Sequence, residues 1–247
     1  MIFGNLNFII AYLLLQLRFR AFLKNGEVRL FAFLLIIGAV ILFFHSTTIL
    51  YGNISKSIRV AIFEVVSALT TTGFSTVSYN TWNDGGLTLL IILMLIGGGA
   101  CSTAGGIKQY RIYILLKALV WEIRKWLYPP NAIIQPYIWE SDRKYFISER
   151  QIKTISLFLF LYLLTYFLGT FAIVLHGIPL RDALFEFASA LGTVGLSIGV
   201  TSVHMSPSIL WIEMIGMFLG RLEFFIIIVS LITLIKDIWR SIIMKRR

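Results

Sequence analysis

The sequence predicts an all-α integral membrane protein built from two similar units. The 247 residues are 58% hydrophobic and only 14% charged, which leaves too little polar surface for a soluble domain of this length. Several apolar stretches are long enough to cross a hydrocarbon core of about 30 Å. A short phrase of small and hydroxylated residues also occurs twice, each time between two such stretches.

The first unit is expected over residues 30–127. Leu30 to about Tyr51 is an apolar run that predicts a membrane-spanning helix. Ile58–Leu69 is a helical stretch too short to span, and it leads into a turn and a polar loop ending at Gly86. A short helix with a returning loop predicts a re-entrant segment. Non-helical backbone at membrane depth is tolerated only where it is buried in protein or lines a wet cavity.

Glycine interrupts the second half of this unit. Leu87 to Ile96 begins another span, and residues 97–106 continue as Gly-Gly-Gly-Ala-Cys-Ser-Thr-Ala-Gly-Gly. Each of the five glycines destabilises a helix by about 1 kcal/mol relative to alanine, so a continuous helix is not expected here. A passive helix kink is the alternative. An amphipathic, basic helix then runs from Lys108 to about Leu127.

The second unit, residues 154–240, repeats this plan after a polar linker over residues 128–153. Thr154 to Leu175 predicts a span, and Leu180 to Leu191 predicts a short helix that again leads into a turn and a polar loop. Ser208 to about Ile235 predicts one final long span.

The positive charges lie almost entirely on one side of this predicted membrane topology. Of the 22 Lys and Arg, 18 lie in the first 29 residues, between Lys108 and Lys153, or from Lys236 onwards. The opposite side has only Lys56, Arg59 and Arg181. Such a bias places the basic loops and the C-terminus in the cytoplasm of a multi-pass cell-membrane protein. The net charge of +10 therefore reflects the basic residues on the cytoplasmic side of the membrane, and nucleic acid is not expected as a partner.

The repeated phrase is a Thr-x-Gly turn that follows Phe-Glu-x-x-Ser-Ala-Leu, and the two copies are 122 residues apart. Rings of backbone carbonyls from such turns replace the water around a potassium ion, and glycine permits the backbone angles required. Two turns that merely pack helices are the alternative. Because the whole phrase recurs between spans, half of an ion-selectivity filter is favoured. Its candidate potassium-binding residues are Thr71, Thr72, Gly73, Phe74, Thr193, Val194, Gly195 and Leu196.

These features together resemble the Trk/Ktr/HKT superfamily of potassium transporters. The resemblance is carried by the order span, short helix, turn, span, by Ser67–Thr76, by Gly97–Lys108, and by Met217-Phe-Leu-Gly-Arg-Leu-Glu223. It covers nearly the whole chain and is most similar to the bacterial and archaeal Trk membrane subunit. That family has four such units around one potassium-channel-like, pseudo-tetrameric pore.

The resemblance implies that this chain is half of such a pore. Residues 30–127 and 154–240 are similar to the third and fourth units. Residues 1–29 are similar to the end of a preceding unit with its cytoplasmic linker. Residues 128–153 correspond to a cytoplasmic linker and 241–247 to a basic cytoplasmic tail. Two turns cannot close a ring of four. A separate first-half chain or a second copy is therefore expected as partner, or the chain is a truncated or split subunit that does not conduct alone.

In the family, the glycine-rich interruption is an intramembrane loop that gates the pore below the filter. A phosphate-binding loop is the rival interpretation, but Ile107 separates Gly106 from Lys108 and breaks that motif. The implied gate residues are Gly97, Gly98, Gly99, Ala100, Cys101, Ser102, Thr103, Ala104, Gly105 and Gly106.

Four charged residues complete the predicted site. Arg221 and Lys108 are expected near the pore, where Arg221 acts as a positive barrier or holds the gate loop. An ion pair of Arg221 with Glu213 or Glu223 is the alternative. Glu64 and Glu186 occupy equivalent places on the two short helices, and they are expected to brace the filter from behind rather than to touch the ion.

The implied function is potassium uptake, with selection by the filter carbonyls and gating by the glycine-rich loop. No nucleophile with a base and no metal-ligand pair occurs at helical spacing, so an enzyme is not expected. A non-conducting assembly or regulatory subunit remains the alternative. No covalent cofactor is implied, and K⁺ is the transported ion. Membrane lipid and, by resemblance, a cytoplasmic nucleotide-binding regulatory subunit are the expected partners.

Overall fold

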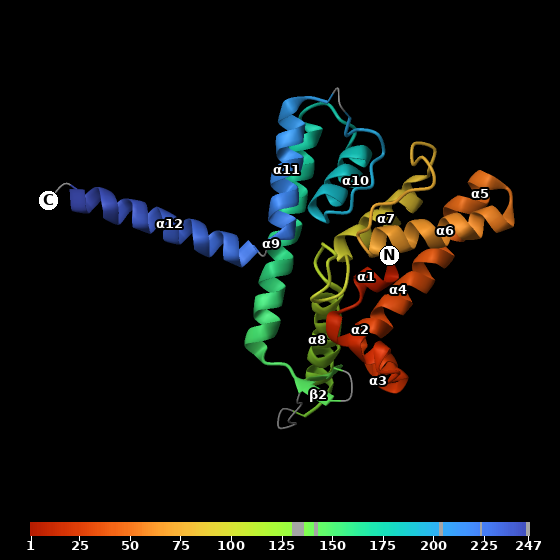
Figure 1. Cartoon of the computed structure of the whole chain (residues 1–247), viewed down its shortest axis with the longest axis horizontal. Helices are drawn as coiled ribbons and strands as arrows, with labels where there is room; N and C mark the ends of the chain where they lie inside the picture. Colours follow the sequence, from red (N-terminus) through yellow and green to blue (C-terminus); the bar gives the residue numbers. More distant parts are fainter. Residues whose placement is uncertain (130–135, 141–142, 203–204, 223, 246–247) are drawn as a thin grey trace.

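The computed structural model describes residues 1–129, 136–140, 143–202, 205–222 and 224–245. Helices dominate this part of the chain (Figure 1). The first half contains α1 (Ile2–Asn5), α2 (Phe8–Leu15), α3 (Phe19–Lys24), α4 (Gly26–Leu42), the π-helix η1 (Phe43–Thr47), α5 (Thr48–Tyr51), α6 (Ile54–Leu69) and α7 (Asp84–Ile96). The second half contains α8 (Gln109–Leu127), β1 (Tyr137–Glu140), β2 (Arg143–Phe146), α9 (Glu149–Val174), α10 (Leu180–Leu191), α11 (Pro207–Arg221) and α12 (Phe224–Lys245).

Among the described residues, two helices are long and apolar enough to cross a membrane. They are Gly26–Tyr51, which runs through α4, η1 and α5, and α9, with mean hydropathies of 2.4 and 2.2. Only 28% of the most apolar window of each is buried inside the protein. The core helix of a soluble domain would be mostly buried, so these outward apolar surfaces favour a lipid environment.

Side-chain caps explain why these helices begin earlier than hydropathy alone predicts. Asn25 Oδ1 accepts a hydrogen bond of 2.8 Å from the Glu27 amide and starts α4 four residues before Leu30. Ser148 and Gln151 form a capping box that starts α9 five residues before Thr154. In the same way Asn53 caps α6, whereas α10 has the predicted bounds Leu180–Leu191.

In each unit one helix, α6 or α10, lies between two others. Helix α6 packs against α4 and α7, and α10 packs against α9 and α11. The units meet where α7 contacts α10. Fully buried side chains from both units, including Leu69, Leu90, Met94, Phe185 and Leu191, form one continuous core at this place.

The predicted interruption after α7 is confirmed. Helix α7 ends at Ile96 and α8 begins only at Gln109, so the glycine-rich loop, residues 97–106, is not helical. Helix α8 then ends at Leu127, as the sequence predicts.

The prediction of a single final span from Ser208 to Ile235 is wrong. Helix α11 ends at Arg221, Leu222 is extended, and α12 points away from the rest of the molecule (Figure 1). Gly220 is pressed against the end of α10, where an added Cβ would lie 1.8 Å from the Leu191 carbonyl oxygen. Phe224 then packs edge-on against Phe158 of α9, with ring centres 5.6 Å apart. These two contacts change the direction of the chain within an apolar stretch, between α11 and α12.

The linker departs from the all-α prediction because it contains an antiparallel hairpin of β1 and β2. Tyr137 pairs with Phe146, Ile138 with Tyr145 and Trp139 with Lys144. Ile138 is buried with Ile114, Trp121 and Ile147 in a second, smaller core. Residues 130–135 and 141–142 of the predicted linker and residues 246–247 of the predicted tail lie outside the described residues.

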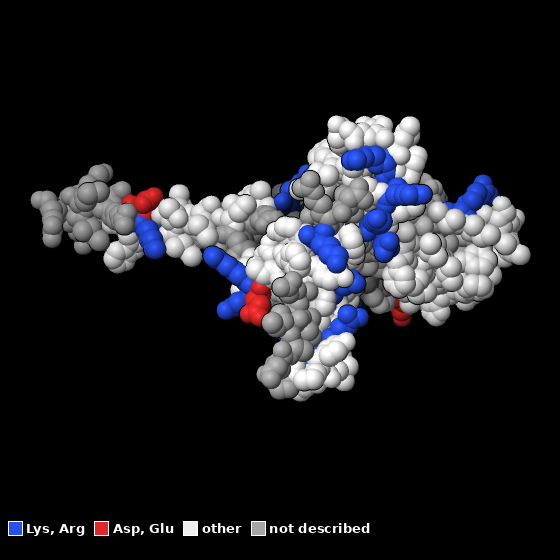
Figure 2. All heavy atoms as spheres, turned by 90° about the horizontal axis from the view of Figure 1, so that it is seen from below, with Lys and Arg blue, Asp and Glu red and all other residues white. Residues whose placement is uncertain are grey.

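One end of the molecule is basic. The hairpin, α3 and the end of α8 lie at the lower end in Figure 1. In the view from below in Figure 2, Lys and Arg are spread over the surface and Asp and Glu are few. The loops that follow α6 and α10 lie toward the opposite end (Figure 1).

Candidate functional site

The two Thr-x-Gly turns, Thr71–Phe74 and Thr193–Leu196, have positive φ angles at the same two positions. Thr71 and Thr193 have φ angles of 49° and 51°, and Gly73 and Gly195 have φ angles of 76° and 94°. Thr72 and Val194, which lie between these residues, do not have positive φ angles. A positive φ strains a β-branched residue such as threonine, and such strain persists where the surrounding structure enforces it, often at functional sites. Alternating φ signs also let successive peptide groups point to the same side of the chain.

The helix that precedes each turn fixes it through the same hydrogen bonds. The amides of Thr72 and Val194 donate to the carbonyl oxygens of Ser67 and Ser189, at 3.0 and 2.9 Å. The serine hydroxyls act differently, because Ser67 Oγ donates to the Phe74 carbonyl whereas Ser189 Oγ accepts from the Gly195 amide. The repeat is therefore close in the backbone and less close in the side chains.

The first turn lies directly against the second. A Cβ added at Gly73 would be 2.0 Å from the Val194 carbonyl oxygen, so only glycine fits there. At Gly195 an added Cβ would meet no atom of the described chain within 4 Å. The two turns thus form a continuous edge that is closed at Gly73 and open at Gly195. A cavity of about 260 Å³ borders the second turn, and Gly195 is among the residues that line it.

Buried glutamates hold the chain that leaves each turn. Glu64 Oε1 accepts hydrogen bonds from the amide and hydroxyl of Thr76, at 3.0 and 2.9 Å, and Oε2 accepts from the Tyr79 hydroxyl. Glu186 Oε1 accepts from Ser197 Oγ and from the amides of Ile198 and Val200, at 2.6, 2.9 and 3.2 Å. Both carboxylates bind the segment after the turn.

A further carboxylate, Glu213 of α11, was not predicted as a site residue. It is 4% exposed, and its Oε1 lies 3.0 Å from Thr201 Oγ1, which is also 2.9 Å from Oε2 of Glu186. At the 122-residue offset of the repeat, Tyr79 and Ile91 correspond to Thr201 and Glu213, so the first unit has no second carboxylate at the equivalent place. A lone acidic residue within an apolar stretch was the available sequence signal.

The glycine-rich loop lies against both turns. The Gly105 amide donates a hydrogen bond of 2.9 Å to Thr71 Oγ1. A Cβ added at Gly105 would lie 2.1 Å from the Gly192 carbonyl oxygen and 2.3 Å from Thr193 Oγ1. One residue of the loop therefore contacts the threonine of each turn.

The two predicted pore cations both bind carbonyl oxygens of this loop. Lys108 Nζ donates to the Ala104 carbonyl and, at 3.4 Å, to that of Ser102. Arg221 Nη1 donates to the Thr103 carbonyl at 2.6 Å, across 118 residues of sequence. The alternative ion pair of Arg221 with Glu213 is wrong, because Glu213 binds Thr201 instead. The other suggested partner of Arg221, Glu223, lies outside the described residues.

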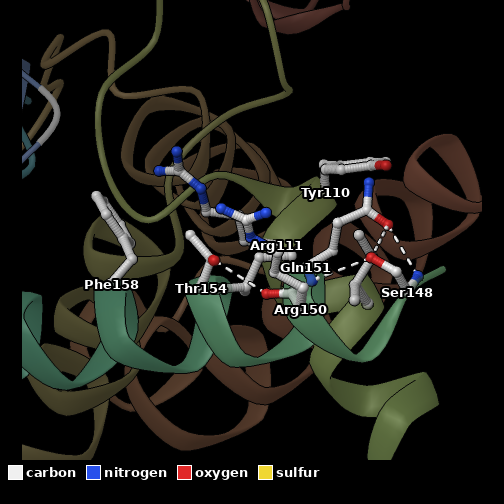
Figure 3. Close-up of a pocket in the computed structure, with 9 residues that line it drawn as sticks. Tyr110, Arg111, Ser148, Arg150, Gln151, Thr154 and Phe158 are labelled. Atoms are coloured by element: carbon white, nitrogen blue, oxygen red, sulfur yellow. Dashed lines mark hydrogen bonds between the residues drawn. The ribbon is translucent and has the colours of Figure 1, made fainter. Parts of the chain in front are cut away.

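A separate cavity of about 290 Å³ lies between α8 and the start of α9, away from the turns (Figure 3). The Arg111 guanidinium stacks 3.9 Å from the centre of the Phe158 ring, and Arg150 also lines the cavity. None of the nine lining residues is an acid, a histidine or a cysteine. Nor do the described residues contain a group of three or more His, Cys, Asp or Glu that would hold a metal ion.

Comparison with known proteins identifies relatives of this chain. Residues 1–239 match the family model TrkH, described as a cation transport protein. An uncharacterized cation transporter of Methanocaldococcus jannaschii is 38% identical over 175 residues, which cover 70% of this chain and 36% of the relative. The Trk system potassium uptake protein TrkH of Escherichia coli is 31% identical over 217 residues, covering 85% of this chain and 43% of the relative.

A solved structure has the same fold. The crystal structure of the potassium transporter TrkH from Vibrio parahaemolyticus matches with a TM-score of 0.75 and 24% sequence identity, over 92% of this chain and 49% of that chain. The chain thus spans between about a third and a half of the length of these relatives.

Proposed function

The chain belongs to the TrkH family of cation transport proteins, and on that premise we propose that it supplies two of the four quarters of a potassium-conducting pore. Trk proteins are membrane transporters of K⁺, not enzymes, and they have no covalent cofactor. Residues 30–127 and 154–240 are the third and fourth pore units in this proposal, and the basic end of the molecule faces the cytoplasm.

The observation that carries the proposal is the pair of turns with matched positive φ angles, packed against each other at Gly73 and Val194. Backbone carbonyls of Thr71–Phe74 and Thr193–Leu196 replace water around the ion. Glu64 and Glu186 keep these turns in shape from behind, through the segments that follow them. The open side of Gly195 is where the next turn of the ring would pack.

The glycine-rich loop is the gate in this proposal. It contacts the threonine of each turn through Gly105, so it lies across the inner end of both turns. Lys108 and Arg221 hold it there through its carbonyl oxygens. Ions pass only when the loop leaves this position.

Because the proposed pore needs four turns and this chain has two, another chain must supply the other two. We propose that a first-half chain with two further units, or a second copy of this chain, completes the ring in the cell membrane. The open edge at Gly195 equally favours the second candidate, a split or truncated subunit that does not conduct alone. The Escherichia coli relative is named as part of a Trk system, which supports further subunits as partners. We propose a cytoplasmic nucleotide-binding regulatory subunit as one of them.

Potassium-uptake-deficient cells test the proposal. The chain is expressed alone and together with a chain carrying the first two units, and growth at low potassium is measured. Rescue by the pair, lost on Gly73→Ser or Gly195→Ser, is the expected result. Gly177→Ser is the matched control, because Gly177 also has a positive φ of 84° with no described atom near its Cβ position. Rescue that survives both filter substitutions would contradict the filter assignment, and absence of rescue would favour the non-conducting subunit.

A further inference from the structure

We infer that Asn5 and Glu27, named here the latch, hold the glycine-rich loop against the two turns. Both residues come from the segment that precedes the first unit, and neither was predicted as a site residue. The inference deepens the proposed function and rests on it, because a latch matters for transport only if the loop closes a pore. The hydrogen bonds between the latch and the loop can be tested without measuring transport.

The latch binds two successive amides of the loop. Asn5, at the end of α1, is 2% exposed, and its Oδ1 accepts a hydrogen bond of 3.0 Å from the Gly99 amide. The Asn5 carbonyl oxygen lies 3.2 Å from the same amide. Glu27, in the first turn of α4, is 6% exposed, and its Oε1 accepts from the Ala100 amide. Figure 1 shows α1 beside the loop that joins α7 to α8.

The position of Glu27 is set by its surroundings. Asn25 Oδ1 accepts from the amides of Glu27 and Val28, at 2.8 and 3.4 Å, and so fixes the first turn of α4. At Gly26 an added Cβ would lie 2.2 Å from the Tyr113 ring, which shows how closely α4 approaches α8 here. The Glu27 carboxylate therefore extends from a helix end that is packed on one side and capped on the other.

Two glycines of the loop make room for the latch. A Cβ added at Gly98 would lie 2.4 Å from Asn5 Oδ1, and one added at Gly99 would lie 2.5 Å from the Asn5 carbonyl oxygen. Glycine has no side chain to pack, so hydrogen bonds to the backbone decide where this part of the loop lies. These glycines thus permit the close approach of Asn5, in addition to interrupting the helix.

The latch and the cations hold different parts of the loop. Lys108 and Arg221 bind carbonyl oxygens of residues 102–104, whereas the latch binds the amides of Gly99 and Ala100. Movement of the loop away from the turns must break the latch bonds. A hydrogen bond to a charged acceptor such as the Glu27 carboxylate contributes more than one between neutral groups, so the latch favours the closed position.

Hydrogen–deuterium exchange of the purified full chain tests the latch without requiring transport. Asn5→Leu and Glu27→Leu remove the side-chain acceptors. Exchange of the Ala100 amide is expected to rise on the order of tenfold in Glu27→Leu. Exchange of the Gly99 amide is expected to rise less in Asn5→Leu, because the Asn5 backbone carbonyl remains as an acceptor. Asn5→Asp and Glu27→Gln keep an acceptor oxygen, so the exchange of both amides is expected to stay near that of the unchanged chain.

Asn7→Leu is the matched control, because Asn7 Oδ1 caps α2 through the Ile9 amide rather than binding the loop. Unchanged loop exchange in both leucine variants would overturn the latch, as would an equal rise in Asn5→Asp and Asn5→Leu. If a leucine variant unfolds, Asn5→Ala and Glu27→Ala remove the same acceptors without added bulk, and unchanged loop exchange there overturns the inference. Failure of potassium uptake by every form, including the unchanged chain, would count against the proposed function alone, since exchange decides the latch.

Discussion

The amide of Gly105 donates a hydrogen bond of 2.9 Å to the side-chain oxygen of Thr71. This bond joins the glycine-rich loop to the first turn, and Thr193 of the second turn lies just beside the same glycine. In the proposed pore this arrangement is a closed state, because the loop occupies the inner end of both turns. The first two predictions follow from it.

Gly105→Ala should displace the loop and increase potassium flux through the assembled transporter. The added methyl group would lie 2.1 Å from the Gly192 carbonyl oxygen, a distance that no carbon tolerates. Overpacking of this kind typically costs about 1–3 kcal/mol, enough to raise the open population severalfold or more. Rubidium uptake into proteoliposomes measures the effect. Gly4→Ala is the control, since its Cβ would only reach ordinary contact with Thr103, and an equal effect in both variants would contradict the prediction.

Arg221→Gln should also favour the open loop. It removes the charged donor to the Thr103 carbonyl, and a hydrogen bond of this kind contributes about 1.5–3 kcal/mol. Uptake should therefore rise by about tenfold or more while selectivity is kept, because the turns are not altered. Arg150→Gln, at the separate basic cavity, serves as the control. A loss of selectivity without greater uptake would show that Arg221 acts on the turns instead.

Glu186 and Glu213 should respond differently to amidation. Glu186→Gln replaces an acceptor oxygen in a group that receives four hydrogen bonds, and this should lower stability by about 1–3 kcal/mol. Thr201 has one hydroxyl proton and cannot donate to both carboxylates. A glutamine at 213 can donate to Thr201 instead, so Glu213→Gln should keep or raise the melting temperature in detergent.

Glu122→Gln is the reference for this comparison, because Glu122 is an exposed carboxylate on α8 paired with Lys125 at 3.1 Å. Its melting temperature should match that of the unchanged chain, as exposed pairs contribute little. Equal destabilisation by Glu186→Gln and Glu213→Gln would contradict the unequal roles assigned to the two carboxylates.

Gly220→Ala should destabilise the second unit. Its Cβ would lie 1.8 Å from the Leu191 carbonyl oxygen, so α11 would have to move away from the end of α10. A cost of about 1–3 kcal/mol is expected, seen as a lower melting temperature. Gly177→Ala introduces the same methyl group in open space and controls for it, although its positive φ adds some strain. Unchanged stability of Gly220→Ala would mean that the two helices are not in firm contact.

The sequence by itself determined the parts of this protein that depend on near neighbours along the chain. Apolar length located the two long helices, and glycine density located the break between Ile96 and Gln109. The repeated phrase located two turns whose φ angles agree at equivalent residues. Capping groups such as Asn25 and Ser148 explain the helix starts that hydropathy placed too late. Such signals act within about one helical turn, so they are legible before any packing is known.

Only the tertiary structure decided the contacts between distant segments. The break at Leu222 lies within an apolar run and arises where Gly220 meets α10. Arg221 binds Thr103 rather than Glu213, which is nearer in sequence, and Asn5 binds Gly99 across 94 residues of sequence. The physical reason is that a buried polar group binds whichever partner packing brings to it, and helix packing is set by many side chains at once. Sequence spacing does not contain that information.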